Sequence, residues 1–271
     1  MPTLGLAHFT VLEVPPLELV SLAARVGYGA IGLRMHPAFP GSPFYELPAG
    51  TTASKQMQRR LKDEGIQLYD VEVVNITEDF SSLSLTGLLE AASALGARRL
   101  TVGGDDPVRS RLVDHFGELC DLAAKFQMGV DLEGITWRHV RTVGDAGCVV
   151  ATAGRSNGGV LVDALHLSRT GGMPRDLRTV PAHLIRSAQL CDAVALQPAT
   201  REAIIAEARS GRLPPGQGTL PLRDLLAELP VGTVLSVEVP KNGSAAPEQH
   251  ALTNFRATQS LVTSCRSTHS V

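Results

Sequence analysis

Four polar side chains in the second half of the sequence directly follow short hydrophobic runs: Glu133, Asp163, Gln189 and Glu238. Such a run is typical of a buried β-strand, so each side chain is expected at a strand end. Carboxylates gathered in a protein interior repel one another and cost free energy unless they are paired or bind a cation. Three carboxylates and one amide form an all-oxygen set, which favours Mn²⁺ or Mg²⁺, with Co²⁺ or Zn²⁺ as alternatives. The pattern therefore predicts one divalent metal site.

Each of the four side chains also has a purely structural interpretation. Asp163 could cap a following helix, Glu133 and Glu238 could pair with neighbouring basic residues, and Gln189 could be an ordinary hydrogen-bonded amide. The metal site remains the preferred interpretation because it explains all four positions together.

Other polar residues near predicted strand ends are candidates for contact with a substrate. His166, three residues after Asp163, is expected to polarise or protonate a substrate oxygen, with packing at a helix start as its structural alternative. Five further residues are expected to contact substrate at the mouth of the site: His8, Arg34, His36, Glu72 and Arg212. Of these, Arg212 is expected to clamp a carboxylate or hydroxyls, with an exposed loop arginine as its structural alternative.

Eight short apolar runs alternate with longer amphipathic segments and must position these side chains. The predicted strands are Leu4–Phe9, Ala30–Arg34, Gln67–Val74, Arg99–Val102, Met128–Leu132, Gly159–Val162, Leu184–Leu190 and Val234–Val237. The predicted helices are Pro16–Val26, Thr52–Glu64, Leu83–Leu95, Val108–Phe126, Thr136–Val150, Arg201–Arg209, Leu222–Glu228 and Ala251–Ser264.

This alternation predicts parallel strands joined by right-handed crossovers. Eight such units in 271 residues favour an α/β fold with a single (β/α)8 TIM barrel over residues 1–271, with residues 265–271 as a frayed polar tail. The first predicted strand is not followed by Gly-x-Gly-x-x-Gly, which argues against a dinucleotide-binding sheet. In such barrels the active site lies at the carboxyl ends of the strands.

Charge and cysteine usage narrow the classes of function. The 25 basic and 27 acidic residues give a formal net charge of −2 without long runs of one sign, which argues against nucleic-acid and membrane-surface partners. The four cysteines form no Cys-x-x-Cys pair and are expected to be reduced. No signal peptide or membrane span is expected. We therefore expect a cytoplasmic protein that binds a small-molecule substrate, and a homodimer would be ordinary for this fold.

Four segments resemble the xylose isomerase-like barrel superfamily, whose members are called sugar phosphate isomerases/epimerases. These are residues 162–166, 189–193, 215–222 and 236–240, with the sequences Val-Asp-Ala-Leu-His, Gln-Leu-Cys-Asp-Ala, Pro-Gly-Gln-Gly-Thr-Leu-Pro-Leu and Ser-Val-Glu-Val-Pro. The resemblance covers nearly the whole chain. It implies metal ligands on strands five to eight, which fall on the four side chains named first.

The resemblance also shows where this sequence departs from the family. The third ligand is typically His, whereas this chain has Gln189, which looks more like bacterial 3-dehydroshikimate dehydratases of the same superfamily. In those enzymes the histidine corresponding to His166 contacts the substrate. Their other substrate-binding residues, near the third strand, have no clear counterpart in Tyr69–Asn75, and Ile135 stands where another branch has His.

These observations lead to one preferred hypothesis of function and several alternatives. The preferred one is a metal-dependent isomerase or epimerase of a ketose or similar polyhydroxy carbonyl compound. In it, Glu133 or Glu238 removes the proton next to a metal-bound carbonyl. The first alternative is a dehydratase, or lyase, of the 3-dehydroshikimate type, in which the second carboxylate assists loss of hydroxide. A non-catalytic barrel that has lost its metal is the other. Endonuclease chemistry, also found in the superfamily, is disfavoured by the slightly acidic charge.

Overall fold

Eight parallel strands close into a barrel in the computed structural model, which describes residues 3–267. Each strand pairs with the next along the chain, and β1 pairs with β8 to close the ring. The strands are β1 (Leu4–Leu6), β2 (Ala30–Arg34), β3 (Gln67–Ile76), β4 (Arg99–Gly104), β5 (Gly129–Glu133), β6 (Gly158–Asp163), β7 (Ile185–Leu190) and β8 (Val234–Val237). The predicted (β/α)8 TIM barrel is therefore confirmed.

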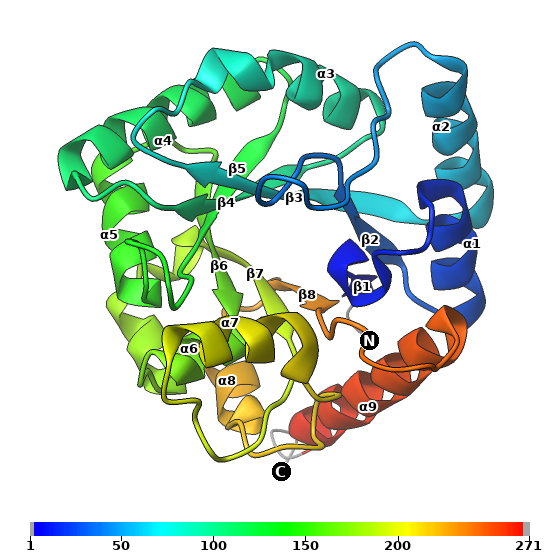
Figure 1. Cartoon of the computed structure of the whole chain (residues 1–271), viewed down its shortest axis with the longest axis vertical. Coiled ribbons are helices and arrows are strands. Elements are labelled where there is room, and N and C mark those ends of the chain that lie inside the picture. The colour runs from blue at the N-terminus through cyan, green and yellow to red at the C-terminus, as the bar shows by residue number, and fades with distance from the viewer. Residues whose placement is uncertain (1–2, 268–271) are drawn as a thin grey trace.

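The helices form a ring outside the strands, as the view down the barrel in Figure 1 shows. They are α1 (Pro16–Val26), α2 (Thr52–Glu64), α3 (Thr86–Ala94), α4 (Arg109–Ala124), α5 (Val143–Ala153), α6 (Ala164–Arg169), α7 (Arg201–Ala206), α8 (Leu222–Glu228) and α9 (Pro247–Ser267). In residues 3–267 no helix is both long and apolar enough to cross a membrane.

Local sequence signals fix the ends of the first two helices where the sequence predicted them. Pro16 opens α1, where its missing N–H costs no hydrogen bond, and Gly27 closes it with a φ of 108°. Thr51 caps α2 by accepting a hydrogen bond from the Ser54 amide, and Gly65 ends it with a φ of 67°. These helices pack against each other beside β2 and β3. Arg34 ends β2 and lies in register with Glu72 in the middle of β3.

The structure corrects three predicted helices. Residues 136–142 form a loop, and α5 begins at Val143 because Thr142 and Asp145 make reciprocal capping hydrogen bonds. The helix predicted over 201–209 ends at Ala206 and continues as a π-helical turn, Glu207–Gly211. The final helix α9 runs on to Ser267, into the stretch predicted to be frayed, and residues 268–271 lie outside the described residues.

One short helix was not predicted from the sequence. Asp163 ends β6 and also caps α6, because its Oδ1 accepts a hydrogen bond from the His166 amide at 2.8 Å. The capping alternative for Asp163 is therefore observed. Its second oxygen, Oδ2, takes no part in the cap, so capping does not exclude a ligand role.

Candidate active site

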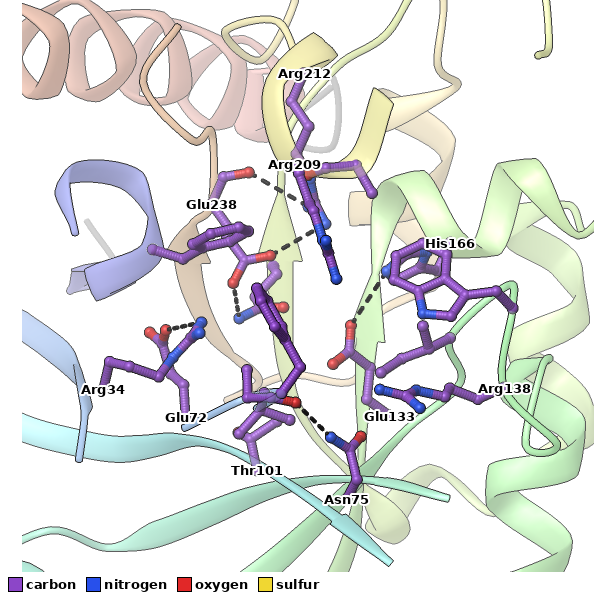
Figure 2. A pocket seen from close by; sticks show the side chains of 18 residues that line it. Arg34, Glu72, Asn75, Thr101, Glu133, Arg138, His166, Arg209, Arg212 and Glu238 are labelled. Carbon is purple, nitrogen blue, oxygen red and sulfur yellow. Dashed lines mark hydrogen bonds and ion pairs between the residues drawn. The ribbon is translucent and has the colours of Figure 1, made fainter. Parts of the chain in front are cut away.

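A cavity opens at the carboxyl ends of the strands and encloses about 690 Å³ of empty space, its mouth included. This size lies within the range of pockets that bind small molecules. Its wall combines aromatic rings with ionisable side chains, drawn in Figure 2. The lining residues important here are Arg34, Phe39, Glu72, Glu133, Arg138, His166, Gln189, Arg209, Arg212 and Glu238.

The four predicted metal ligands come together at this rim. Glu133 and Asp163 are the last residues of β5 and β6, Gln189 lies in β7, and Glu238 follows β8 directly. Parallel pairing places Asp163 beside Gln189, and Gln189 beside Ser236 two residues before Glu238. All four are buried, with 3–7 % of their surface exposed. Adjacent strands thus deliver four oxygen-bearing side chains to one place.

Arg212 enters the same space and pairs with two of the carboxylates. Its Nη1 donates to Asp163 Oδ2 at 2.6 Å, and its Nη2 lies 3.1 Å from Glu238 Oε2. Its side chain is only 2 % exposed, and its Nε donates to the carbonyl of Ala208 in the π-helical turn. Arg212 lines the cavity, and its guanidinium is a buried partner of the ligand carboxylates, so the alternative of an exposed loop arginine is wrong. Its contact with substrate stays a prediction.

The π-helical turn that sets the position of Arg212 is itself held by a buried ion pair. Both carboxylate oxygens of Glu207 accept from Arg169 in α6, at 2.7 and 2.6 Å. This two-point contact ties the turn to the helix that begins at Asp163. Single π-helical turns are frequent at functional sites, and this one supplies Arg209 and the chain leading to Arg212.

The charges around the cavity shift the acidities of its carboxyl groups in different directions. Burial, with the nearby charges of Asp163 and Glu238, raises the pKa of Glu133 well above its ordinary value. Burial also raises the pKa of Glu238, to about 7, although Arg212 opposes the shift. Burial alone would raise the pKa of Asp163 too, but Arg212 and His166 outweigh it and lower that pKa. Arg212 also lowers the pKa of Glu133, but it makes no ion pair with that carboxylate and does not outweigh burial there.

Two observations fit a divalent ion at this rim. Gln189 Nε2 donates to Glu238 Oε1 at 3.0 Å, which leaves Gln189 Oε1 buried without a hydrogen-bond partner. Within residues 3–267 no hydrogen bond reaches the Glu133 carboxylate. Donor atoms of Glu133, Asp163 and His166 also lie within 4.8 Å of one another, so His166 is an alternative nitrogen ligand. Oxygen donors that lack partners are what a bound cation would satisfy.

His166 stands beside Glu133 as a neutral imidazole. Burial lowers its pKa to about 4, so the ring is uncharged at neutral pH. Its Nδ1 lies 3.1 Å from Thr136 Oγ1, and its Nε2 lies 3.8 Å from Glu133 Oε1. Trp137 packs edge-on against the ring, with centroids 5.0 Å apart, and lines the cavity. If the Thr136 hydroxyl donates to Nδ1, the ring proton is on Nε2, where it can be donated into the cavity.

The five predicted mouth residues divide into two groups. Arg34 and Glu72 line the cavity and pair with each other at 3.4 Å. His8 does not line it: the ring is fully buried, its Nε2 bonds the Val14 carbonyl and its Nδ1 accepts from the Arg34 amide. The ring of His8 is thus a structural element of the rim, which corrects its predicted contact with substrate.

His36 also lies outside the cavity wall, which likewise corrects its predicted role. It is half-buried, and its Nδ1 is buried without a hydrogen-bond partner. Burial lowers the pKa of this ring, as it does for His8.

Sequence reasoning missed Arg138, Arg209 and Phe39 as lining residues. Arg138 pairs with Asp105, which follows β4, and Arg209 stacks on the Phe39 ring. All three belong to loops or to the π-helical turn, where apolar residues have no regular spacing that would predict the structure. A count of arginines in the segments after each strand could have marked Arg138 and Arg209, but not Phe39.

A family model and a related protein both match part of this chain. The model of the family described as "Xylose isomerase-like TIM barrel" matches residues 20–260. A 3-dehydroshikimate dehydratase of Pseudomonas aeruginosa is 30% identical over 141 residues, which cover 50% of this chain and 22% of that protein. The chain therefore corresponds to less than a quarter of that relative's length.

Two solved structures share the fold over almost the whole chain. A xylose isomerase-like TIM barrel/4-hydroxyphenylpyruvate dioxygenase fusion protein has a TM-score of 0.80 at 23% identity, covering 98% of this chain and 43% of its own. The IolI protein with a bound zinc atom also has a TM-score of 0.80, at 21% identity, covering 97% of this chain and 99% of its own. At these identities the likeness shows the fold alone.

Proposed function

Because the chain belongs to the xylose isomerase-like TIM barrel family, we propose that it is a divalent-metal-dependent enzyme that moves a proton on a small polyhydroxy carbonyl compound. The proton is the one on the carbon next to the carbonyl. The observation that carries this proposal is the meeting of Glu133, Gln189 and Glu238 in the wall of one cavity, with Asp163 buried beside them against Arg212. Gln189 Oε1 is buried there without a hydrogen-bond partner.

These four side chains would hold the ion. When bound, a divalent ion supplies Lewis-acid polarisation of a substrate carbonyl and its neighbouring hydroxyl. The oxygen donors favour Mn²⁺ or Mg²⁺, although the zinc atom in IolI keeps Zn²⁺ among the ions to test.

Glu133 and Glu238 supply the acid and base. They lie on opposite sides of the cavity in Figure 2. Burial raises the pKa of both carboxyl groups in the absence of an ion, and a bound cation would offset this rise. One carboxylate accepts the proton from carbon, and the other returns a proton from the opposite side. Neutral His166 donates from Nε2 to the substrate oxygen on which charge develops. This arrangement suits an isomerase or epimerase of a ketose or similar compound.

A second candidate is a dehydratase, which uses the same first step. After the proton is removed from carbon, the other carboxyl group protonates a departing hydroxyl, which leaves as water as a carbon–carbon double bond forms. Gln189 at the third ligand position and the likeness to the Pseudomonas aeruginosa 3-dehydroshikimate dehydratase favour this candidate.

The test is metal-dependent exchange of the proton next to the carbonyl. Mn²⁺- or Mg²⁺-loaded protein is incubated in D₂O with a panel of ketoses and with 3-dehydroshikimate, and deuterium uptake is followed by NMR. Ultraviolet absorbance reports an aromatic dehydration product. Glu133→Gln and Glu238→Gln are compared with Glu118→Gln, an exposed residue of α4, as the matched control.

We expect exchange in the wild type and in Glu118→Gln, and its loss in both cavity variants. Epimerised or isomerised sugar identifies the first candidate, and an ultraviolet-absorbing product identifies the second. No exchange with any substrate in a protein that binds metal would leave a non-catalytic barrel as the correct interpretation.

A further inference from the structure

We propose that Arg209, stacked on Phe39, binds a carboxylate of the substrate, which makes the substrate a hydroxy-keto acid instead of a neutral sugar. This inference rests on the proposed function and names the class of compound that the same cavity accepts. It is carried by the way the charged groups of the cavity pair with one another.

Four arginines line the cavity, and three of them already have carboxylate partners. Arg34 pairs with Glu72, Arg138 with Asp105, and Arg212 with Asp163 and Glu238. Within residues 3–267 no carboxylate pairs with Arg209. Arg209 is exposed and lines the cavity, where it carries a positive charge that no carboxylate of the described residues pairs with.

The contact between Arg209 and Phe39 leaves the hydrogen-bonding edge of the guanidinium free. Its Cζ lies 4.3 Å from the centre of the Phe39 ring, a separation at which the guanidinium is attracted to the face of the ring. The N–H donors point outward in the plane, where they match the two oxygens of a carboxylate. Stacking thus restricts the orientation of the group without consuming its donors.

The ring that supports Arg209 is held in place by the loop between β2 and α2. The Phe39 amide donates to the hydroxyl of Ser42, a buried residue, at 3.2 Å. The side-chain amide of Asn75 in β3 donates to the carbonyl of Ala38 at 2.8 Å. The backbone beside Phe39 is therefore tied to β3 through Asn75 and braced within its own loop by Ser42, while the Phe39 ring itself is exposed. Arg209 reaches this ring from the π-helical turn.

The balance of charge also points to a substrate with one negative charge. With every carboxyl group ionised, the three carboxylates in the wall and the Asp105 and Asp163 partners outnumber the four arginines by one. A divalent ion adds two positive charges, which turns this excess of one negative charge into an excess of one positive charge. A monocarboxylate neutralises that excess, whereas a phosphate dianion exceeds it and a neutral ketose leaves Arg209 unmatched.

Binding of paired acids and esters tests this directly. Shikimate and methyl shikimate share one ring and lack the ketone, so neither is consumed by carbonyl chemistry. Gluconate and its methyl ester provide an open-chain pair. Isothermal titration calorimetry on Mn²⁺-loaded protein gives the ratio of ester Kd to acid Kd for the wild type, Arg209→Gln, Phe39→Leu and Arg223→Gln. Arg223 is an exposed arginine of α8 and serves as the matched control.

We expect at least one acid to bind the wild type ten times or more tightly than its ester, a ratio that Arg223→Gln retains. Arg209→Gln should reduce the ratio to about one to two, and Phe39→Leu should give an intermediate value. Unchanged metal content and circular dichroism show that the variants are folded.

An unchanged ratio in Arg209→Gln, equal binding of acid and ester, or no binding of any acid would overturn the assignment. These results are separable from failure of the proposed function. Metal-dependent deuterium exchange into neutral ketoses, with no preference for acids, would leave the proposed function standing and remove only the carboxylate site.

Discussion

Arg212 Nη1 donates to Asp163 Oδ2 across 2.6 Å at the rim of the barrel, where both side chains are almost completely buried. The arginine thus supplies positive charge at an oxygen that the proposed metal ion also requires. Because a buried carboxylate is costly without a cation, Arg212 stabilises the metal-free rim. A bound ion would take over part of this role.

Replacing Arg212 by Met is therefore expected to lower the free energy of unfolding of the metal-free protein by about 3–5 kcal/mol, since it leaves buried carboxylates without their partner. Saturating Mn²⁺ should restore a part of this loss. Urea denaturation with and without Mn²⁺ measures both values, and Arg223→Met is the exposed control, expected to change stability by less than about 0.5 kcal/mol. A loss that is identical with and without Mn²⁺ would argue against shared occupancy of these oxygens.

Removing the charge of Glu238 tests the metal site itself. Wild-type protein purified without chelator should contain close to one divalent ion per chain by elemental mass spectrometry, and Glu238→Gln should contain much less. Turnover in this variant should fall below about a tenth of the wild-type rate, which corresponds to a loss of more than about 1.4 kcal/mol of transition-state stabilisation. Full metal content in Glu238→Gln would exclude it as a ligand.

Gln189 is the residue by which this site differs from the ligand set typical of its family. Replacing it by Leu removes the unpartnered Oε1 and should weaken Mn²⁺ binding about tenfold or more. Replacing it by His supplies a nitrogen donor, which should shift the preference toward Zn²⁺ and Co²⁺. Competition with a fluorescent chelator gives each Kd. Equal affinities in the wild type and Gln189→Leu would show that the amide is not a ligand.

The buried ring of His8 predicts a pH-dependent stability. Burial lowers its folded-state pKa below the ordinary value of 6.5, and protonation of Nδ1 would break the hydrogen bond from the Arg34 amide. Below pH 6.5 the unfolded chain takes up a proton that the folded protein resists, so the free energy of unfolding falls as pH drops. The contribution is fully present above pH 6.5 and decreases by at most about 1.4 kcal/mol per pH unit below it.

Urea denaturation at pH 7.5 and pH 5.5 measures this effect for the wild type and for His8→Gln. Other groups also titrate in this interval, so the informative quantity is the difference between the two proteins. The wild type should lose more stability on acidification than the variant. Equal losses would mean that the ring is not held neutral by the fold.

Much of the fold followed from local chemistry in the sequence. The bounds of α1, α2, α8, β2 and β8 were predicted as observed, because proline, glycine and capping residues mark the ends of helices and apolar runs mark buried strands. The helix predicted at 136–150 failed in its first half, since the Thr142–Asp145 capping pair starts α5 later. The spacing of apolar residues alone could not show that the helix begins only after this capping pair.

The sequence by itself determined the barrel and the identity of four oxygen-bearing side chains at the ends of its strands. The reason is that the spacing of apolar residues marks where each strand ends, and the order of strands along the chain sets their order around the barrel. The tertiary structure decided which charges meet. It placed Arg212 against Asp163, turned the His8 ring away from the cavity, and set Arg209 over Phe39. These pairings join loops far apart in the chain, and their energies depend on distance and burial, which no local pattern encodes.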